Sequence, residues 1–443
     1  MNYKAGIVSL GCAKNQVDAE MLLFSLRQKG FEIVDDPAKA DAVIVNTCGF
    51  IESAKQESID EIIELGKLKR EGKIKAIIVT GCLAERYQNE ITRQLYEVDA
   101  AVGIGANSKI ADITLDALGG KKTELFPSKL ELPLEGGRIQ STPRYSAYLK
   151  IAEGCDNRCT YCAIPLIRGG YRSRDFDSVI SEARALAENG VKELNVIAQD
   201  TTRYGEDLFG EPQLAKLLRE LCKIDGLRWI RVLYCYPDRV TDELIDVIAN
   251  EEKIVKYIDL PLQHCNAEVL KRMNRRGSRE SLTALLNKIK SKIPGVVLRT
   301  TFITGFPGET EEQFEELCEF SKDIEFERLG CFPYSQEEDT PAADFPNQLD
   351  EKTKQDRADI IMEQQQIIMS RYCESLVGTE AEVLVEGYDR IAECWYGRTY
   401  ADAPEVDGCV FFTCDGKKPN IGDFVKVNIT DFTGIDPVGR NYA

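Results

Sequence analysis

Residues 145–165 read YSAYLKIAEGCDNRCTYCAIP, and this stretch decides how the centre of the chain is expected to fold. Its first half is a short apolar run typical of a β-strand. The loop that follows carries Cys155, Cys159 and Cys162 at spacings of four and three. Three thiolates can hold a [4Fe-4S] cluster while leaving one iron without a protein ligand. The spacing therefore predicts a cluster with an open iron at the end of a strand.

An open iron predicts a particular cofactor. S-adenosylmethionine (SAM) can chelate it through its amino and carboxylate groups, and an electron from the cluster then cleaves a C–S bond to release a 5′-deoxyadenosyl radical. The cofactor carries this chemistry, and the protein positions it. A zinc site, or cysteines that simply pack in the interior, are the alternatives, but structural zinc takes four ligands and no fourth cysteine or histidine lies nearby. We therefore expect a radical-generating enzyme.

Strand-like and helix-like segments alternate on both sides of this loop, from residue 141 to residue 372. Six such units predict a partial (βα)6 TIM-type barrel, a radical SAM core, with one helix over 350–376 leaving the barrel. Active sites of such barrels lie at the carboxyl ends of the strands. The side chains and glycine expected there, as candidates for binding SAM or substrate, are Gln199, Gln263, His264, Thr304 and Gly305. For His264 a hydrogen-bonded structural role is the alternative, and for the glycine-containing loop it is turn formation. No catalytic side chain beyond the cluster ligands can be assigned.

Residues 1–117 also alternate between strands and helices, which predicts a doubly wound parallel sheet. Cys12, Cys48 and Cys82 each follow one of its strands. Because the carboxyl ends of parallel strands lie together, these three thiols should converge in space. They predict a second, auxiliary [4Fe-4S] cluster, and three separately packed cysteines are the alternative.

Two further segments complete the expected organisation, an α/β protein of three domains. Residues 118–140 are rich in glycine, proline and charge, as in a linker. Residues 373–443 contain short alternating strands separated by turns, which predicts a small antiparallel β-barrel.

Composition narrows the class of protein. The chain has 443 residues, fifteen cysteines, one histidine and a formal net charge of −18. Many cysteines in a chain with no export signal and no apolar run of membrane length indicate a cytoplasmic protein whose thiols bind metal. The single histidine excludes histidine-rich metal sites. The strongly acidic charge favours a basic partner over RNA phosphates as the main binding target.

Together these motifs resemble the methylthiotransferase family of radical SAM enzymes over essentially the whole chain. That family combines a three-cysteine N-terminal domain, a radical SAM barrel and a C-terminal TRAM-type barrel. The matching runs are SLGCAKNQVDAE, NTCGFIESAKQES, TGCLAERY, YLKIAEGCDNRCTYCAIPLIRG, IAQDTTRYG, LPLQH, TTFITGFPGETEE and DAPEVDG. The runs AQDTT and LPLQH resemble those of the family branch whose enzymes modify an aspartate of small-subunit ribosomal protein twelve. The branch acting on isopentenyl-adenosine in transfer RNA typically has GQN and QSGS there. Ala19 replaces the usual serine of the first run.

The resemblance implies ligands and a reaction. Cys12, Cys48 and Cys82 would bind the auxiliary cluster, and Cys155, Cys159 and Cys162 the SAM-cleaving one. One SAM would supply a methyl group, and another the radical that removes hydrogen from the aspartate β-carbon. A methylated sulfur held at the auxiliary cluster would then be transferred, and an external electron donor is required.

The C-terminal segment bears on the substrate independently. Residues 377–443 hold twelve acidic and six basic side chains, which suits a basic ribosomal protein, free or on the ribosome, better than RNA; an ordinary solvated surface is the alternative. Two alternatives stay open: a methylthiotransferase for transfer RNA, and a non-catalytic iron–sulfur electron-transfer protein.

Overall fold

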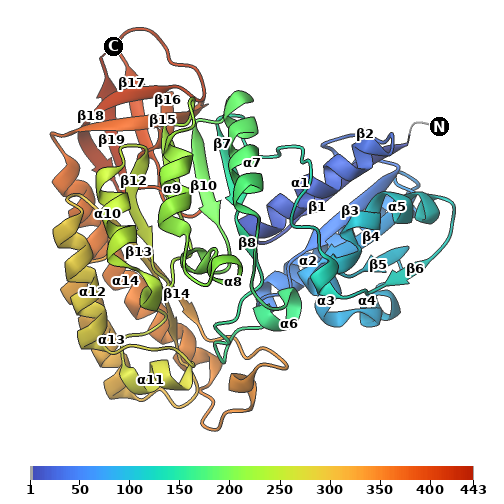
Figure 1. The fold of residues 1–443 in the computed structure, drawn as a ribbon, viewed down its shortest axis with the longest axis horizontal. Helices are drawn as coiled ribbons and strands as arrows, with labels where there is room; N and C mark the ends of the chain where they lie inside the picture. The colour runs from blue at the N-terminus through green and yellow to red at the C-terminus, as the bar shows by residue number, and fades with distance from the viewer. Residues whose placement is uncertain (1–2, 443) are drawn as a thin grey trace.

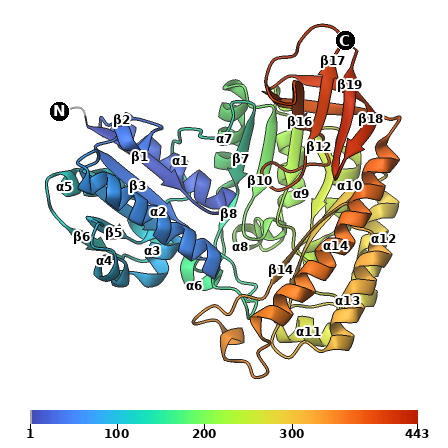
Figure 2. The same cartoon turned by 180° about the vertical axis from the view of Figure 1, so that it is seen from behind.

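The computed structural model describes residues 3–442, which form two six-stranded sheets, a closed barrel and a two-stranded sheet. In Figure 1 the N-terminal sheet (blue) lies beside the central sheet (green to orange), and the C-terminal barrel (red) covers one end of the central sheet. Figure 2 shows the long helix α14 (Glu351–Leu376) running along the outside toward that barrel. No helix within 3–442 combines the length and the apolar character needed to cross a bilayer.

The N-terminal sheet is parallel throughout, in the order β2-β1-β3-β4-β5-β6. Its strands are β1 (Lys4–Ser9), β2 (Glu32–Ile33), β3 (Ala42–Thr47), β4 (Ala76–Gly81), β5 (Ala100–Val102) and β6 (Thr123–Leu125). Its helices are α1 (Ala13–Gln28), α2 (Glu52–Arg70), α3 (Cys82–Tyr87), α4 (Asn89–Gln94) and α5 (Ile110–Leu118).

Both faces of this sheet are buried, as a doubly wound fold requires. Side chains of β3 alternate between two apolar clusters: Ile44 packs in the cluster that contains Leu22 of α1, and Val45 in the one that contains Ile62 of α2. The predicted doubly wound parallel sheet is confirmed. The segment after β4 forms two short helices, α3 and α4, because the backbone at Gln88 has a φ of 45° and interrupts the helix there. Strand β6 lies within the segment expected to be a linker.

The central sheet is parallel in the order β14-β13-β12-β11-β10-β7. Its strands are β7 (Ser146–Lys150), β10 (Glu193–Ile197), β11 (Trp229–Val232), β12 (Ile254–Asp259), β13 (Val297–Thr304) and β14 (Arg328–Pro333), and β8 (Ala152–Glu153) pairs with β9 (Arg172–Ser173). Its helices are α6 (Ile164–Arg168), α7 (Phe176–Glu188), α8 (Glu206–Phe209), α9 (Leu214–Cys222), α10 (Asp242–Asn250), α11 (Ala267–Arg272), α12 (Arg279–Lys292) and α13 (Glu311–Ile324). The predicted partial TIM-type barrel of six βα units is confirmed.

The C-terminal barrel is closed by β15 (Glu380–Asp389), β16 (Cys394–Arg398), β17 (Val410–Cys414), β18 (Phe424–Thr433) and β19 (Asp436–Asn441). Four of its strand pairs are antiparallel, but β17 and β19 pair in parallel, so the expected wholly antiparallel barrel is corrected in this detail. Sequence patterning did not reveal β19, because Pro437 and Gly439 are typical of turns.

The C-terminal barrel covers the amino ends of the central strands. Glu193, the first residue of β10, accepts hydrogen bonds from both terminal nitrogens of Arg398, at 2.9 and 2.5 Å. Both side chains are buried. Around them, Trp229 of β11 packs in one apolar cluster with Leu384 and Ala403 of the C-terminal segment. This docking closes one end of the central barrel and leaves the carboxyl ends of its strands for chemistry.

Acidification is expected to weaken this docking. Although burial opposes ionisation, Arg398 and Arg231 lower the pKa of Glu193 from its ordinary value of 4.5 to about 2. A carboxyl with a lowered folded-state pKa stabilises the fold fully above pH 4.5, and that stabilisation is lost as the pH falls toward 2. Arg398→Gln should cost on the order of 3 kcal/mol of unfolding free energy at neutral pH, and the difference from the wild type should shrink below pH 4.5.

Urea unfolding of the wild type and the variant across this pH range measures the effect. Arg390→Gln is the matched control, since Arg390 lies exposed on the same barrel. A constant difference between wild type and Arg398→Gln down to pH 2 would contradict the assignment.

Candidate active site

The loops after β1, β3 and β4 bring the three N-terminal cysteines to one edge of the sheet. Cys12 precedes the first residue of α1, Cys48 directly follows β3, and Cys82 begins α3. The first two loops touch: a Cβ atom built on Gly11 would lie 2.8 Å from Sγ of Cys48. A side chain at position 11 would therefore displace a thiol of the triad.

Asn15 fixes the geometry of these loops. Its side-chain nitrogen donates to the carbonyls of Leu10, Asn46 and Thr47, at 2.7, 3.2 and 3.2 Å. The side chain of Asn46 in turn donates to the carbonyl of Asn15 at 2.7 Å. The first turn of α1 is thereby tied to the end of β3. Sequence reasoning did not single out either asparagine, although both lie in the motifs SLGCAKN and VNTC.

The second triad lies in the loop between β8 and α6. The amide of Cys162 donates to the carbonyl of Cys159 at 3.0 Å, and the amide of Cys155 to the carbonyl of Gly169 at 3.1 Å. Asn274 holds the loop from outside, because its side chain donates to the carbonyl of Arg158 at 2.9 Å.

All six cysteines of the two triads line one cavity of about 620 Å³, which we call the six-cysteine cavity after them; Cys235 belongs to the same lining. The N-terminal domain supplies Cys12, Cys48 and Cys82, and the central barrel supplies Cys155, Cys159 and Cys162. The C-terminal segment contributes residues 404–406 to the same lining. The two triads therefore face a common space that no single domain encloses.

The five pocket candidates separate into two groups. Gln199 and Gln263 line the six-cysteine cavity, whereas His264, Thr304 and Gly305 are not part of its lining. Burial, together with nearby arginines, lowers the pKa of His264 to about 3, so this ring is neutral, and its Nδ1 accepts from the amide of Asn266 at 2.9 Å. Thr304 donates to the carbonyl of Lys354 in α14 at 3.2 Å. The amide of Gly305 donates to Glu309 at 3.0 Å.

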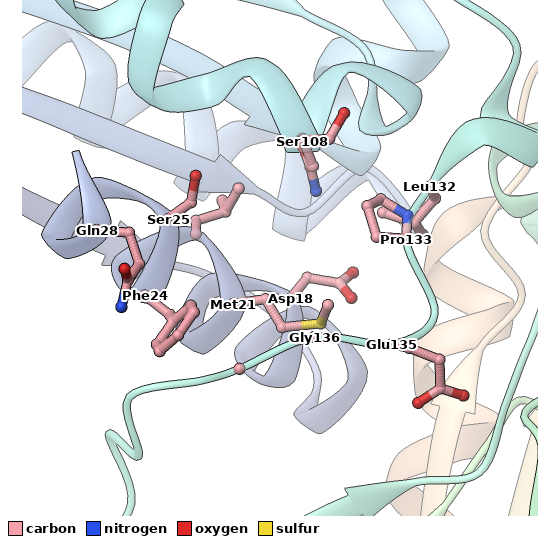
Figure 3. A pocket seen from close by; sticks show the side chains of 13 residues that line it. Asp18, Met21, Phe24, Ser25, Gln28, Ser108, Leu132, Pro133, Glu135 and Gly136 are labelled. Atoms are coloured by element: carbon pink, nitrogen blue, oxygen red, sulfur yellow. The ribbon is translucent and has the colours of Figure 1, made fainter. Parts of the chain in front are cut away.

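A smaller cavity of about 300 Å³ lies apart from the cysteines. It is bounded by α1 and by residues 132–137 of the connecting segment, and no cysteine lines it. Figure 3 shows Met21 of α1 beside Gly136, with Phe24 and Glu135 on opposite sides of them. The surface of this smaller cavity is mostly apolar. The cysteine thiols line the six-cysteine cavity instead.

Cations surround the sulfurs of the six-cysteine cavity. Burial opposes ionisation of Cys12, but Lys14 and Arg168 outweigh it and lower the pKa of Cys12 below its ordinary value. Burial raises the pKa of Cys82 to about 12 and that of Cys155 to about 11. Cys12 is therefore the N-terminal thiol that ionises most readily.

Arg168 of α6 joins the two triads' domains. Its guanidinium donates to Sγ of Cys82 at 3.4 Å and to Oδ1 of Asn15 at 2.9 Å in the N-terminal domain. It also donates to Asp18 of α1 at 2.5 Å and to Glu153 of β8 at 3.1 Å. All of these partners, including Cys82, are buried residues. This network ties the N-terminal domain to the central barrel.

Thiolates are the side chains by which proteins hold iron–sulfur clusters. Among residues 3–442 no three histidine, cysteine, aspartate or glutamate side chains meet closely enough to share one metal ion. The thiols of each triad instead surround part of a larger space. A cubane binds its thiolates at separate corners, so its ligands need not converge on one point.

Curated relatives match the chain from end to end. It is 50% identical to "Ribosomal protein uS12 methylthiotransferase RimO" of Thermoanaerobacter sp. (strain X514), over 98% of this chain and 99% of that protein. It is 51% identical to the protein of the same name from Caldanaerobacter subterraneus subsp. tengcongensis, again over 98% and 99%. This chain belongs to the RimO family.

Family models divide the RimO chain into the parts that the structure shows. The Radical SAM superfamily model matches residues 149–321, the model described as "Uncharacterized protein family UPF0004" matches 4–103, and the TRAM domain model matches 377–441. The protein is therefore a radical SAM enzyme and a sulfur-group transferase. Among solved structures, the radical SAM methyltransferase TsrM from Kitasatospora setae superposes with a TM-score of 0.55 at 16% identity, over 75% of each chain. At that identity the likeness concerns the fold.

The RimO run DAPEVDG, residues 402–408, has a structural explanation. Asp402 pairs with Arg328 of β14, and Asp407 accepts from the hydroxyl of Tyr257 at 2.6 Å. Between them, Glu405 lines the six-cysteine cavity and accepts from Tyr148 of β7 at 3.3 Å. This segment docks the C-terminal barrel on the radical SAM barrel and places a carboxylate at the site.

Proposed function

We propose that this enzyme transfers a methylthio group to the β-carbon of an aspartate in ribosomal protein uS12, and that it holds two [4Fe-4S] clusters while doing so. The observation that carries the proposal is the shared lining of the six-cysteine cavity by one thiol triad from each domain. Relatives about half identical over nearly the full length carry this activity in their names.

The residues fit two clusters in the following way. Cys12, Cys48 and Cys82 would hold the auxiliary cluster, and the loop over 155–162 would hold the SAM-cleaving one. When bound, these groups and SAM supply a reducing electron, a 5′-deoxyadenosyl radical and a methylthio sulfur. An electron donor outside this chain must provide the electron.

The protein's own contribution is position and charge. Arg275 donates to Sγ of Cys159 at 3.6 Å and to the carbonyl of Pro261 at 2.6 Å, so a positive charge stands beside the SAM-side triad. Arg168 provides the corresponding charge beside Cys82. Gln199 and Gln263 add polar groups that can orient SAM or substrate within the cavity.

Charge supports a basic protein substrate. Some of the acidic side chains of residues 377–443 face the central barrel and not the solvent, because Asp402 and Asp407 form ion pairs with residues of that barrel. Other acids, for example Glu380, Glu393 and Asp431, lie on the exposed surface. An acidic surface of this kind favours association with a basic ribosomal protein.

The test compares substrates directly. Reconstituted enzyme, SAM and reductant are incubated with uS12 from the same organism or with its transfer RNA, and the added methylthio mass is measured on each. We expect modification of one aspartate of uS12 and none of the RNA. Modification of the RNA alone would establish the transfer-RNA alternative, and the absence of 5′-deoxyadenosine in every reaction would establish an electron-transfer protein.

A further inference from the structure

Lys14 is an ammonium group placed inside the six-cysteine cavity. It lies in the first turn of α1, two residues after Cys12, and it lines the cavity although it is only 8% exposed. Its Nζ sits 3.3 Å from the centroid of the Tyr234 ring, across the domain boundary, at the end of β11. The side chain therefore points from the auxiliary triad toward the central barrel.

The other cations that line this cavity already have partners. Arg168 pairs with Asp18 and Glu153, and Arg299 pairs with Asp259 at 2.9 Å. Arg275 is hydrogen-bonded to a carbonyl and to the thiol of Cys159.

Lys14 forms no ion pair with a carboxylate anywhere in residues 3–442. Asp259 is the nearby acid, but one of its oxygens accepts from Arg299 at 2.9 Å and the other from the amide of Tyr234 at 2.8 Å. An ammonium removed from water without a carboxylate partner is costly, and in its own domain the charge of Lys14 acts on the Cys12 thiol, whose pKa it lowers. The aromatic face of Tyr234 offsets part of that cost. The arrangement is suited to a carboxylate that arrives from outside the chain.

The position of Lys14 matches the proposed chemistry. In an aspartate side chain the carboxylate is bonded directly to the β-carbon. A cation that holds this carboxylate therefore holds the reacting carbon within one bond of it. Because Lys14 follows Cys12 in the same loop and helix, that carbon would lie on the auxiliary side of the cavity, facing the SAM-side triad.

We propose that Lys14 binds the side-chain carboxylate of the substrate aspartate and so selects aspartate over uncharged residues. This inference rests on the proposed function. A charge-assisted hydrogen bond in a shielded site contributes about 1.5 to 3 kcal/mol, which corresponds to about tenfold to one-hundredfold in affinity.

The experiment is a double-mutant cycle across the two proteins. Binding of uS12 is measured with cluster-loaded enzyme and no reductant, so that no turnover occurs. The enzyme is wild type or Lys14→Met, and uS12 carries its target aspartate or an asparagine there. Lys39→Met is the matched control, because Lys39 is an exposed lysine of the same domain. Iron content and 5′-deoxyadenosine formation without uS12 are followed in parallel.

We expect Lys14→Met to weaken binding of the aspartate form by about tenfold to one-hundredfold and to leave binding of the asparagine form nearly unchanged. Lys14→Arg should retain the preference for aspartate, and Lys39→Met should bind both forms of uS12 as the wild type does. Equal losses for both forms of uS12, no loss at all, or weaker binding of SAM instead of uS12 would each overturn the proposal.

Two further outcomes are distinguishable. Lys14→Met could lower the iron content. In that case the affinities of the wild type and of Lys14→Arg for the two forms of uS12 test the proposal. If either enzyme binds the aspartate and asparagine forms equally well, the role of Lys14 is overturned. If the wild-type enzyme modifies transfer RNA and not uS12, the proposed function itself fails before Lys14 is tested.

Discussion

Replacing Cys155 with alanine is expected to abolish cleavage of SAM. The loop over 155–162 offers three thiols to one cluster, and two thiols leave that cluster with too few protein ligands to bind SAM at a single open iron. The variant should form no 5′-deoxyadenosine above background and no methylthio product. Its iron content should fall from about eight to about four atoms per chain, because the auxiliary triad is intact.

Cys155 is a suitable position because its side chain is only partly buried, so its removal leaves a small packing defect. The control is Cys394→Ala, which removes a partly buried thiol of the C-terminal barrel that does not line the six-cysteine cavity. Unchanged 5′-deoxyadenosine formation in Cys155→Ala would remove this triad from the SAM site.

Replacing Cys12 with alanine should separate the two halves of the reaction. The SAM-side triad is untouched, so reduced enzyme should still convert SAM to 5′-deoxyadenosine. Methylthio transfer to uS12 should be lost, since the auxiliary cluster would lack a ligand, and iron should again fall to about four atoms per chain. Mass spectrometry of uS12 and chromatography of the nucleoside products measure the two halves in one sample.

Cys12 is exposed to the cavity, and its replacement removes little apolar packing. Cys394→Ala again serves as the control and should keep both activities. Methylthio-uS12 formed by Cys12→Ala at the wild-type rate would mean that the N-terminal triad does not take part in sulfur transfer, and the proposal of two functional clusters would have to be abandoned.

Much of the fold was predictable because its signals are local. Runs such as AVIV over 42–45 are apolar on both faces, and only a sheet covered on both sides buries them. Short strands escaped prediction for the opposite reason. Strand β6 has three residues, and β19 contains a proline and a glycine, so their hydrogen-bonding partners and not their own patterns make them strands.

The convergence of Cys12, Cys48 and Cys82 on one sheet edge could also be inferred from the order of strands along the chain. Parallel strands end together, so residues far apart in the chain meet when each follows a strand. His264 could not be placed in this way. It follows the fourth central strand, as Gln263 does, yet only Gln263 lines the cavity, and the backbone at Gln263 has a φ of 72° that turns the chain between them.

The sequence alone determined the chemistry of this protein, which is two sets of three thiols that follow strands. The type of each ligand and the spacing between ligands can be read directly from the residues. Only the tertiary structure decided that both sets share one cavity. That depends on contacts between residues remote in sequence, such as Arg168 with Cys82 and Lys14 with Tyr234. It also decided that Glu405 of the C-terminal segment reaches the same space. Such contacts arise from domain packing, which no local pattern encodes.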